Sequence, residues 1–136
     1  MLSADGKMSR FLWVCLGSAA GGGARYLLVG WVSKLLGSGF PYGTLAVNVI
    51  GSFLIGGLMY AGLEASRLSE TALLALTTGV MGGFTTYSAF SYQTLKALQD
   101  GEGTVAIVNV VMTLAGCLLA CWLGWAGAHS VWSPSA

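Results

Sequence analysis

The sequence predicts an all-α integral membrane protein with four transmembrane helices, the third of them broken near the middle of the membrane. Of its 136 residues, 55% are hydrophobic and only 8% are charged, whereas soluble domains carry about 25% charged residues. So few ionised groups cannot cover so apolar a chain in water, and most of its surface must face lipid. The apolar residues also gather into stretches of about 20 or more, the length that spans the hydrocarbon core.

Four apolar stretches extend roughly over residues 11–35, 42–63, 71–96 and 104–126. The first follows a polar start, but its apolar run is too long for a signal peptide, and we expect a retained helix. Short segments rich in glycine, proline and charged residues separate the stretches. None of these segments has room for a soluble domain, so we expect residues 1–136 to form a single integral membrane domain.

The positive charges of the loops are nearly balanced between the two predicted sides of the membrane. One side carries Lys7, Arg10 and Arg67, and the other carries Lys34 and Lys96. Because an excess of Lys and Arg on one side sets orientation, this near balance predicts insertion both ways up, which permits an antiparallel dimer. The alternative is that short loops show so small a bias by chance.

Charge and cysteine usage exclude several classes of function. A net charge of +1 gives no basic field for nucleic acid. All five carboxylates, Asp5 among them, lie in predicted termini or loops, whereas a proton-coupled pump needs an acid inside the membrane. The three cysteines lie in apolar runs, where packing is the expected role. We therefore expect a passive pathway and no enzymatic activity.

Two polar features interrupt the first two apolar stretches. Arg25 is the charged residue that lies well inside an apolar stretch. Such a cation either marks an ion path or extends its charged end toward the membrane–water interface. Thr44, Asn48, Ser52 and Gly56 follow one another at intervals of four and share one helix face. The fourth stretch repeats this pattern with Asn109, Thr113 and Cys117. Such a face either lines a path or packs helices closely, but the mid-span amide of Asn48 must find partners.

The third stretch contains the segment GGFTTYSAFS over residues 82–91. Glycine pairs followed by threonines disfavour a continuous helix, so we expect a break and a new start at Thr85 or Thr86. Unpaired carbonyls within a bilayer persist only where they are buried in protein or line a cavity, and they suit Na⁺. The alternative is close helix packing through Gly79 and Gly83.

After the predicted break, aromatic and hydroxyl side chains alternate on neighbouring faces. Tyr87 and Phe90 are three residues apart, as are Ser88 and Ser91. Ring edges carry partial positive charge and hydroxyls donate hydrogen bonds, so together they can stabilise an anion that has lost its water. The alternative for the aromatic pair is ordinary core packing.

In these residues the sequence resembles the Fluc or CrcB family of small bacterial fluoride channels. Three motifs carry the resemblance, GGARY at 22–26, PYGTLAVNVIGSF at 41–53 and GGFTTYSAF at 82–90. The resemblance implies a multi-pass protein of the bacterial inner membrane that lets cytoplasmic fluoride escape passively and so reduces its toxicity. It also implies an antiparallel, dual-topology homodimer with two fluoride pores and one structural Na⁺ at the dimer interface.

The resemblance also assigns roles to residues of this sequence. It implies that the backbone carbonyls of Gly82 and Thr85 hold the Na⁺. It implies an amide donor at Asn48, an aromatic box of Tyr87 and Phe90, and a positive vestibule at Arg25. Hydroxyl groups would complete the fluoride path, from Thr86, Ser88 and Ser91, and the candidates on the fourth stretch are Asn109 and Thr113.

Two departures from the family pattern accompany this resemblance. The family usually has Phe-Ser-Thr-Phe where this sequence has Tyr-Ser-Ala-Phe at 87–90, and Gln93 replaces a common carboxylate. Two rival functions are a four-span multidrug exporter and a structural membrane subunit. The exporter requires a mid-span carboxylate, which this sequence lacks, and the structural subunit requires the polar faces to serve only in helix packing.

Overall fold

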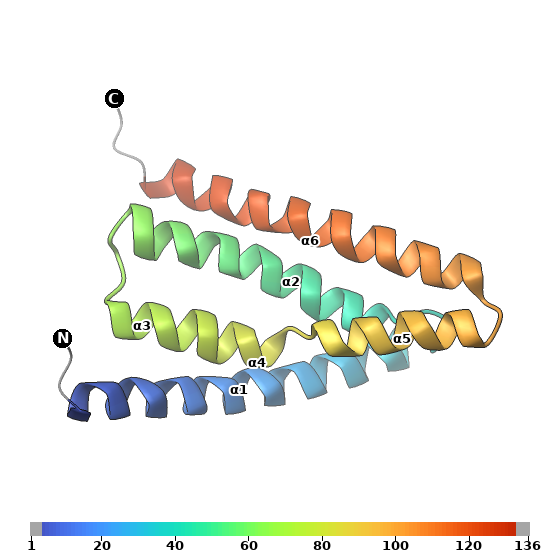
Figure 1. Ribbon diagram of the computed structural model, residues 1–136. Helices are drawn as coiled ribbons and strands as arrows, with labels where there is room; N and C mark the ends of the chain where they lie inside the picture. Colours follow the sequence, from blue (N-terminus) through green and yellow to red (C-terminus); the bar gives the residue numbers. More distant parts are fainter. Residues whose placement is uncertain (1–3, 133–136) are drawn as a thin grey trace.

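The computed structural model describes residues 4–132, and within this range the regular elements are all helical (Figure 1). The α-helices are α1 (Ala4–Leu36), α2 (Tyr42–Met59), α3 (Glu70–Leu74), α4 (Gly82–Phe84), α5 (Tyr87–Gln99) and α6 (Gly103–Trp132). Two π-helical segments continue them, η1 (Tyr60–Glu64) after α2 and η2 (Ala75–Met81) after α3. The predicted all-α class is therefore confirmed.

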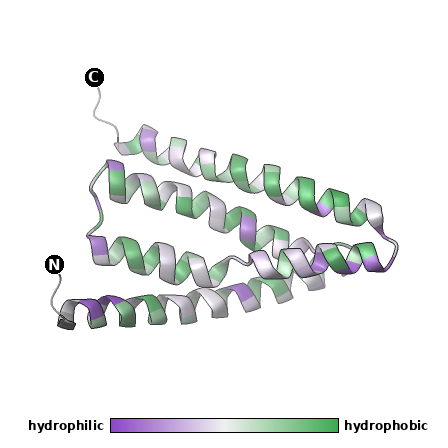
Figure 2. Cartoon of the chain, in the orientation of Figure 1, coloured by the Kyte–Doolittle hydropathy of each residue, from purple (hydrophilic) through white to green (hydrophobic). Residues whose placement is uncertain are grey.

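Three helical segments of the described chain are long and apolar enough to cross a membrane, Gly6–Leu36, Tyr42–Glu64 and Gly103–Trp132. In Figure 2 these helices are coloured mostly as apolar, and isolated hydrophilic residues interrupt the apolar colour along each helix. The helices extend beyond the predicted spans, since helical hydrogen bonding continues past the hydrocarbon where polar side chains are solvated. The predicted span 71–96 is a broken helical segment over residues 70–99.

The broken segment lies between α1 on one side and α2 with α6 on the other (Figure 1). The most extensive helix contact joins α2 to α6, and α1 packs along η2 and α4. Both ends of the described chain and the connection from η1 to α3 lie at one end of the molecule. This arrangement places the break of the third segment at the centre of the protein, where α1 and α2 flank it.

Charged side chains lie near the ends of the helices. Glu64 ends η1 and accepts a hydrogen bond from Trp125 Nε1 at 2.8 Å, and Arg10 of α1 forms an ion pair with Glu70 at the start of α3. At the opposite end Lys96 pairs with Asp100. The prediction for Asp5 falls outside the described side chains. Glu64 and Glu70 thus belong to helical ends and not to a free loop, because each has a partner there.

Glycines allow α1 to approach the broken segment closely. A Cβ added to Gly21 would collide with the Val80 carbonyl oxygen, and one added to Gly83 would collide with the backbone of Ser18. Gly79 likewise faces the backbone of Val14 and Gly17 of α1. The close packing proposed for Gly79 and Gly83 is therefore present together with the helix break, so the two interpretations are not exclusive.

Replacing Gly21 by alanine tests this backbone contact. Alanine favours a helix by about 1 kcal/mol over glycine, but its methyl group must push α1 from the broken segment, at a cost of about 1–3 kcal/mol or more. We expect Gly21→Ala to lower the midpoint of thermal unfolding in detergent. Gly23→Ala, where nothing lies within 4 Å of the added Cβ, is the matched control and should not lower it. Equal midpoints in both variants would contradict the contact.

Candidate functional site

The helix break lies at Thr85 and Thr86. Both residues have extended backbones, with φ −84° and ψ 160° at Thr85 and φ −151° and ψ 108° at Thr86. Thr86 then caps α5, because its Oγ1 accepts a hydrogen bond from the Ala89 backbone N–H at 3.2 Å. The break expected from the sequence is confirmed, and the new helix begins one residue later, at Tyr87.

Asn48 of α2 binds the backbone of the break through both ends of its amide. Its Nδ2 donates to the Thr86 carbonyl oxygen at 3.1 Å, and its Oδ1 accepts from the Thr86 backbone N–H at 2.8 Å. These two bonds fix the orientation of the amide. The reverse orientation would place the amide nitrogen against the Thr86 N–H and the amide oxygen against the Thr86 carbonyl oxygen. The side chain replaces the helical hydrogen bonds that Thr86 lacks, at a site where both residues are buried.

The break also leaves carbonyl groups without helical partners. Among the described residues no hydrogen bond ends on the Gly82 carbonyl, because the N–H group four residues later donates to Asn48 instead. Gly82 is exposed. The Thr85 carbonyl oxygen accepts a long hydrogen bond of 3.4 Å from Nη1 of Arg25. Carbonyl oxygens in this arrangement can accept donors or coordinate a hard cation.

A groove of about 460 Å³ lies beside the break, and we call it the central groove. Its lining comes from α2, η2, α4, Thr85, α5 and α6, and consists of Asn48, Gly51, Ser52, Ile55, Thr77, Met81, Gly82, Thr85, Tyr87, Phe90, Thr113, Leu114, Cys117 and Leu118. The ring centroids of Tyr87 and Phe90 lie 5.5 Å apart, and the ring planes are inclined by 53° to each other. Phe90 is 6% exposed whereas Tyr87 is 76% exposed, so one ring is fixed by packing and the other is open to the surroundings.

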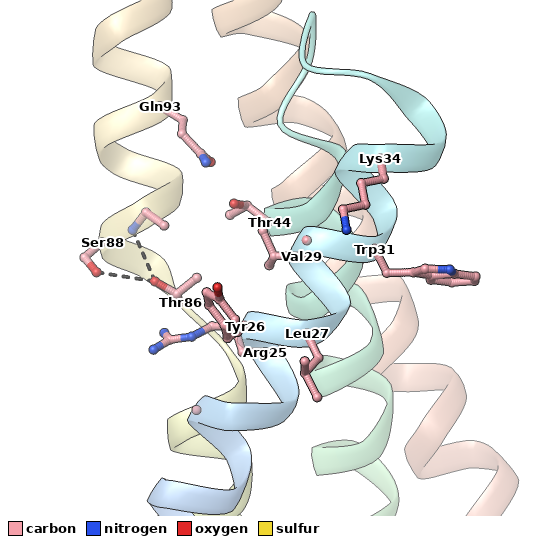
Figure 3. A pocket seen from close by; sticks show the side chains of 13 residues that line it. Arg25, Tyr26, Leu27, Val29, Trp31, Lys34, Thr44, Thr86, Ser88 and Gln93 are labelled. Atoms are coloured by element: carbon pink, nitrogen blue, oxygen red, sulfur yellow. Dashed lines mark hydrogen bonds between the residues drawn. The ribbon is translucent and has the colours of Figure 1, made fainter.

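A second cavity of about 910 Å³ lies between α1, the start of α2 and α5, and we call it the cationic hollow (Figure 3). Its lining consists of Gly22, Arg25, Tyr26, Leu27, Val29, Gly30, Trp31, Lys34, Thr44, Thr86, Ser88, Ala89 and Gln93. Arg25 and Lys34 are the charged members of this lining, which contains no carboxylate. Two cations without an acid beside them attract anions.

The break separates the two cavities. Asn48 lines the central groove and Thr86 lines the cationic hollow, and these two residues are hydrogen-bonded to each other. On the side of the hollow, the Thr86 and Ser88 hydroxyls lie 3.3 Å apart (Figure 3). Hydroxyl groups therefore stand at the boundary between a cationic cavity and an aromatic one.

Of the remaining predicted site residues, one lines a cavity and two do not. Thr113 lines the central groove, whereas Asn109 is 1% exposed and donates to Thr94 Oγ1 at 2.9 Å. Ser91 is exposed, belongs to neither cavity and donates to the Tyr87 carbonyl oxygen at 3.0 Å. The structure thus brings most of the predicted residues to the two cavities but leaves Asn109 and Ser91 outside their linings.

Sequence reasoning missed Lys34, Thr94 and Gln93 as candidates for this site. Lys34 was counted only among the charges that flank the first loop, but it lies in the last turn of α1 and lines the cationic hollow. The spacing of four residues from Phe90 to Thr94, and again from Thr94 to Leu98, was a usable signal for Thr94. Residues four apart lie on the same helix face, so the Thr94 hydroxyl lies one turn from the Phe90 ring. Gln93 was noted only as a departure from the family, yet its buried Oε1 has no partner among the described residues.

Replacing Asn48 tests how strongly the site depends on its amide. Asn48→Ala leaves the Thr86 N–H and C=O groups buried without partners, and each costs about 1–3 kcal/mol. We expect a loss of at least about 2 kcal/mol in unfolding free energy, measured by denaturant titration in detergent. Ser52→Ala is the control one turn further along α2, since the Ser52 hydroxyl makes no hydrogen bond among the described residues. An unchanged stability of Asn48→Ala would show that Asn48 does not hold the break.

A family model described as CrcB-like protein, Camphor Resistance (CrcB), matches residues 12–125 of the chain. The matched range begins in α1, ends in α6 and includes both cavities and the helix break. The similarity therefore extends over the whole arrangement of helices described above.

Several curated proteins are about half identical to this chain. One from Trichlorobacter lovleyi is 51% identical over 111 residues, which cover 82% of this chain and 89% of the relative. One from Pelobacter propionicus is 50% identical over 117 residues, with 86% and 91% covered. One from Geobacter sulfurreducens is 50% identical over 117 residues, with 86% and 94% covered. Each of the three is named a fluoride-specific ion channel FluC.

Proposed function

This chain belongs to the CrcB family, and on that premise we propose that it is a fluoride-selective ion channel. It is not an enzyme. The observation that carries this proposal is the pair of cavities that meet at the Asn48–Thr86 contact, one cationic and one lined by aromatic rings. The names of the relatives from three bacteria supply the identity of the ion.

The proposed path runs from the cationic hollow past the break into the central groove. Arg25 and Lys34 raise the local concentration of anions. Thr86 and Ser88 then offer hydroxyl donors, and Asn48 offers the second hydrogen of its amide nitrogen, since one is committed to Thr86. In the central groove the ion meets the edges of Tyr87 and Phe90. Thr113 lines the same groove and is a weaker candidate for the path, whereas Ser91 and Asn109 lie outside both linings.

Fluoride presents a specific physical difficulty, because a small, hard anion loses a large hydration free energy on entering a dry pore. Neutral donors and ring edges compensate this loss without holding the ion as tightly as a row of cations would. The linings of both cavities contain no carboxylate that could carry a proton in exchange. Fluoride therefore leaves the cytoplasm down its own electrochemical gradient, which lowers its toxicity.

The working unit that we propose is an antiparallel homodimer with dual topology in the bacterial inner membrane, in which the broken segment 70–99 crosses the membrane together with the three long helices. Tyr87 is 76% exposed and Gly82 is also exposed, so the central groove of one copy is open on one side. A second copy would cover it. The inner membrane is the one that a passive path out of the cytoplasm must cross.

We propose a structural Na⁺ held by the backbone carbonyls of Gly82 and Thr85 from both copies. The Gly82 carbonyl, on which no hydrogen bond ends among the described residues, suits an oxygen ligand. The Thr85 carbonyl already receives Arg25, but at 3.4 Å this bond is long and a second lone pair remains. The cation at the break would hold both halves of the broken segment together.

Fluoride efflux from liposomes tests the proposed function. Purified protein reconstituted in fluoride-loaded or chloride-loaded vesicles should release fluoride rapidly and chloride at the rate of protein-free vesicles, because chloride is too large and too weakly hydrogen-bonded for the path. Equal release of both ions, or no fluoride release from vesicles that contain folded protein, would contradict the proposal. The second result would leave a structural subunit as the better interpretation.

A ring substitution tests whether the central groove carries the ion. We expect Phe90→Ala to reduce fluoride efflux by about tenfold or more, because a ring edge worth about 0.5–1.5 kcal/mol is lost together with the shape of the groove. Tyr92→Ala is the matched control, since Tyr92 lies on the same helix, is 66% exposed and lines neither cavity. Equal efflux in the two variants would contradict a path through the groove.

Sodium exchange tests the proposed cation site. We expect the midpoint of thermal unfolding in detergent to fall when Na⁺ is replaced by N-methylglucamine at constant ionic strength, because a ligand that binds only the folded protein stabilises it. Restoring Na⁺ should restore the midpoint, whereas K⁺ should do so only in part because carbonyl oxygens spaced for Na⁺ lie too close together for the larger ion. An identical midpoint in all three salts would argue against the site.

A further inference from the structure

A directional chain of hydrogen bonds joins α6 to α5 beside the central groove. Thr113 Oγ1 donates to Asn109 Oδ1 at 3.5 Å, and Asn109 Nδ2 donates to Thr94 Oγ1 at 2.9 Å. Thr94 Oγ1 in turn donates to the Phe90 carbonyl oxygen at 2.8 Å. The chain thus begins and ends on residues that line the groove, whereas Asn109 and Thr94 do not belong to the lining.

Each middle member of the chain has a fixed orientation. The Thr94 hydroxyl is an acceptor toward Asn109 and a donor toward Phe90, so its proton has one position. Asn109 is 1% exposed and uses both ends of its amide within the chain. Polar groups buried among helices that face lipid have no water to replace a lost partner. Removing one link therefore leaves a buried group unsatisfied.

We propose that Thr94 and Asn109 are positioning residues that fix the ring of Phe90 relative to the opposite wall of the groove and so set the rate of fluoride passage. The inference rests on the proposed function. The Phe90 carbonyl is the group that Thr94 binds, and Phe90 itself is 6% exposed in the packed wall of α5. Asn109 anchors that turn of α5 to α6. A shift of this contact changes the width of the groove between Phe90 and Thr113.

This role differs from that of a pore-lining donor. A lining residue must turn a polar hydrogen toward the ion, but Asn109 has its amide committed on both sides and lies outside the groove. The weakest link is the 3.5 Å bond from Thr113. Thr113 is therefore the member of the chain whose hydroxyl is free to turn to an ion, while Thr94 and Asn109 remain in place.

Thr94→Val is the most direct test, since it removes the hydroxyl at nearly constant volume. Thr94 also borders a small apolar cavity with Ala106, Ile107 and Val110, where a second methyl group is accommodated. The measurement is the unitary fluoride current in planar bilayers, which does not depend on how many molecules fold. We expect Thr94→Val to lower this current by about fivefold to tenfold, the equivalent of one lost hydrogen bond. Thr94→Ser, which keeps the hydroxyl, should restore it.

Two further variants make the test decisive. Asn109→Leu combined with Thr94→Val removes both middle members of the chain, and only the Thr113 hydroxyl, which lines the groove, loses its acceptor. The double variant is therefore expected to fold even where the single variant does not, and its unitary current should be lowered equally. Thr104→Val, at the exposed start of α6, is the control for a threonine substitution and should conduct normally.

Three results would overturn the inference. A normal unitary current from Thr94→Val, or from the double variant, would show that the chain does not position the ring. A current that stays low in Thr94→Ser would show that the methyl group, and not the hydroxyl, matters. No fluoride current from the unsubstituted protein would instead remove the proposed function, and the inference with it.

Discussion

The amide of Asn48 is the interaction on which the rest of the site depends. A helix that breaks inside a membrane must find new partners for its backbone groups, because lipid offers none. Asn48 provides both a donor and an acceptor for Thr86, and Thr86 then caps the following helix with its hydroxyl. With those groups satisfied, the chain can leave the Gly82 carbonyl without a helical partner at the centre of the protein. The break is thus held mainly by the Asn48 side chain of α2, with a longer bond from Arg25 of α1.

Close packing and the break support each other. Glycines at the contact of α1 with η2 and α4 bring backbones together, which gives van der Waals attraction where the hydrophobic effect is absent. The same glycines weaken the intrinsic preference for a helix. A segment rich in glycine therefore packs tightly against α1 up to Phe84 and loses its helical path directly afterwards, where the two threonines follow.

The sequence predicted the helical class, three long apolar helices and the position of the break, because hydrocarbon requires long apolar runs and glycine with threonine disrupts a helix. It identified Asn48 as a polar residue that needed partners but not which groups satisfy it, since Thr86 is distant in the sequence and the pairing depends on how α2 packs. Thr94 and Lys34 were missed for the same reason. The role of Thr94 depends on how α5 packs against α6, and that of Lys34 on the length of α1, so residue spacing alone could only place Thr94 on the helix face of Phe90.

The exposed peptide group of Gly82 also bears on how the protein is made. A backbone carbonyl that meets hydrocarbon costs several kcal/mol, so a newly inserted single copy holds free energy that covering this group releases. In the proposed homodimer, this cost would favour association without any extra apolar surface. A copy without its partner in this homodimer would keep its broken helix open to lipid and would retain the free-energy cost that association removes.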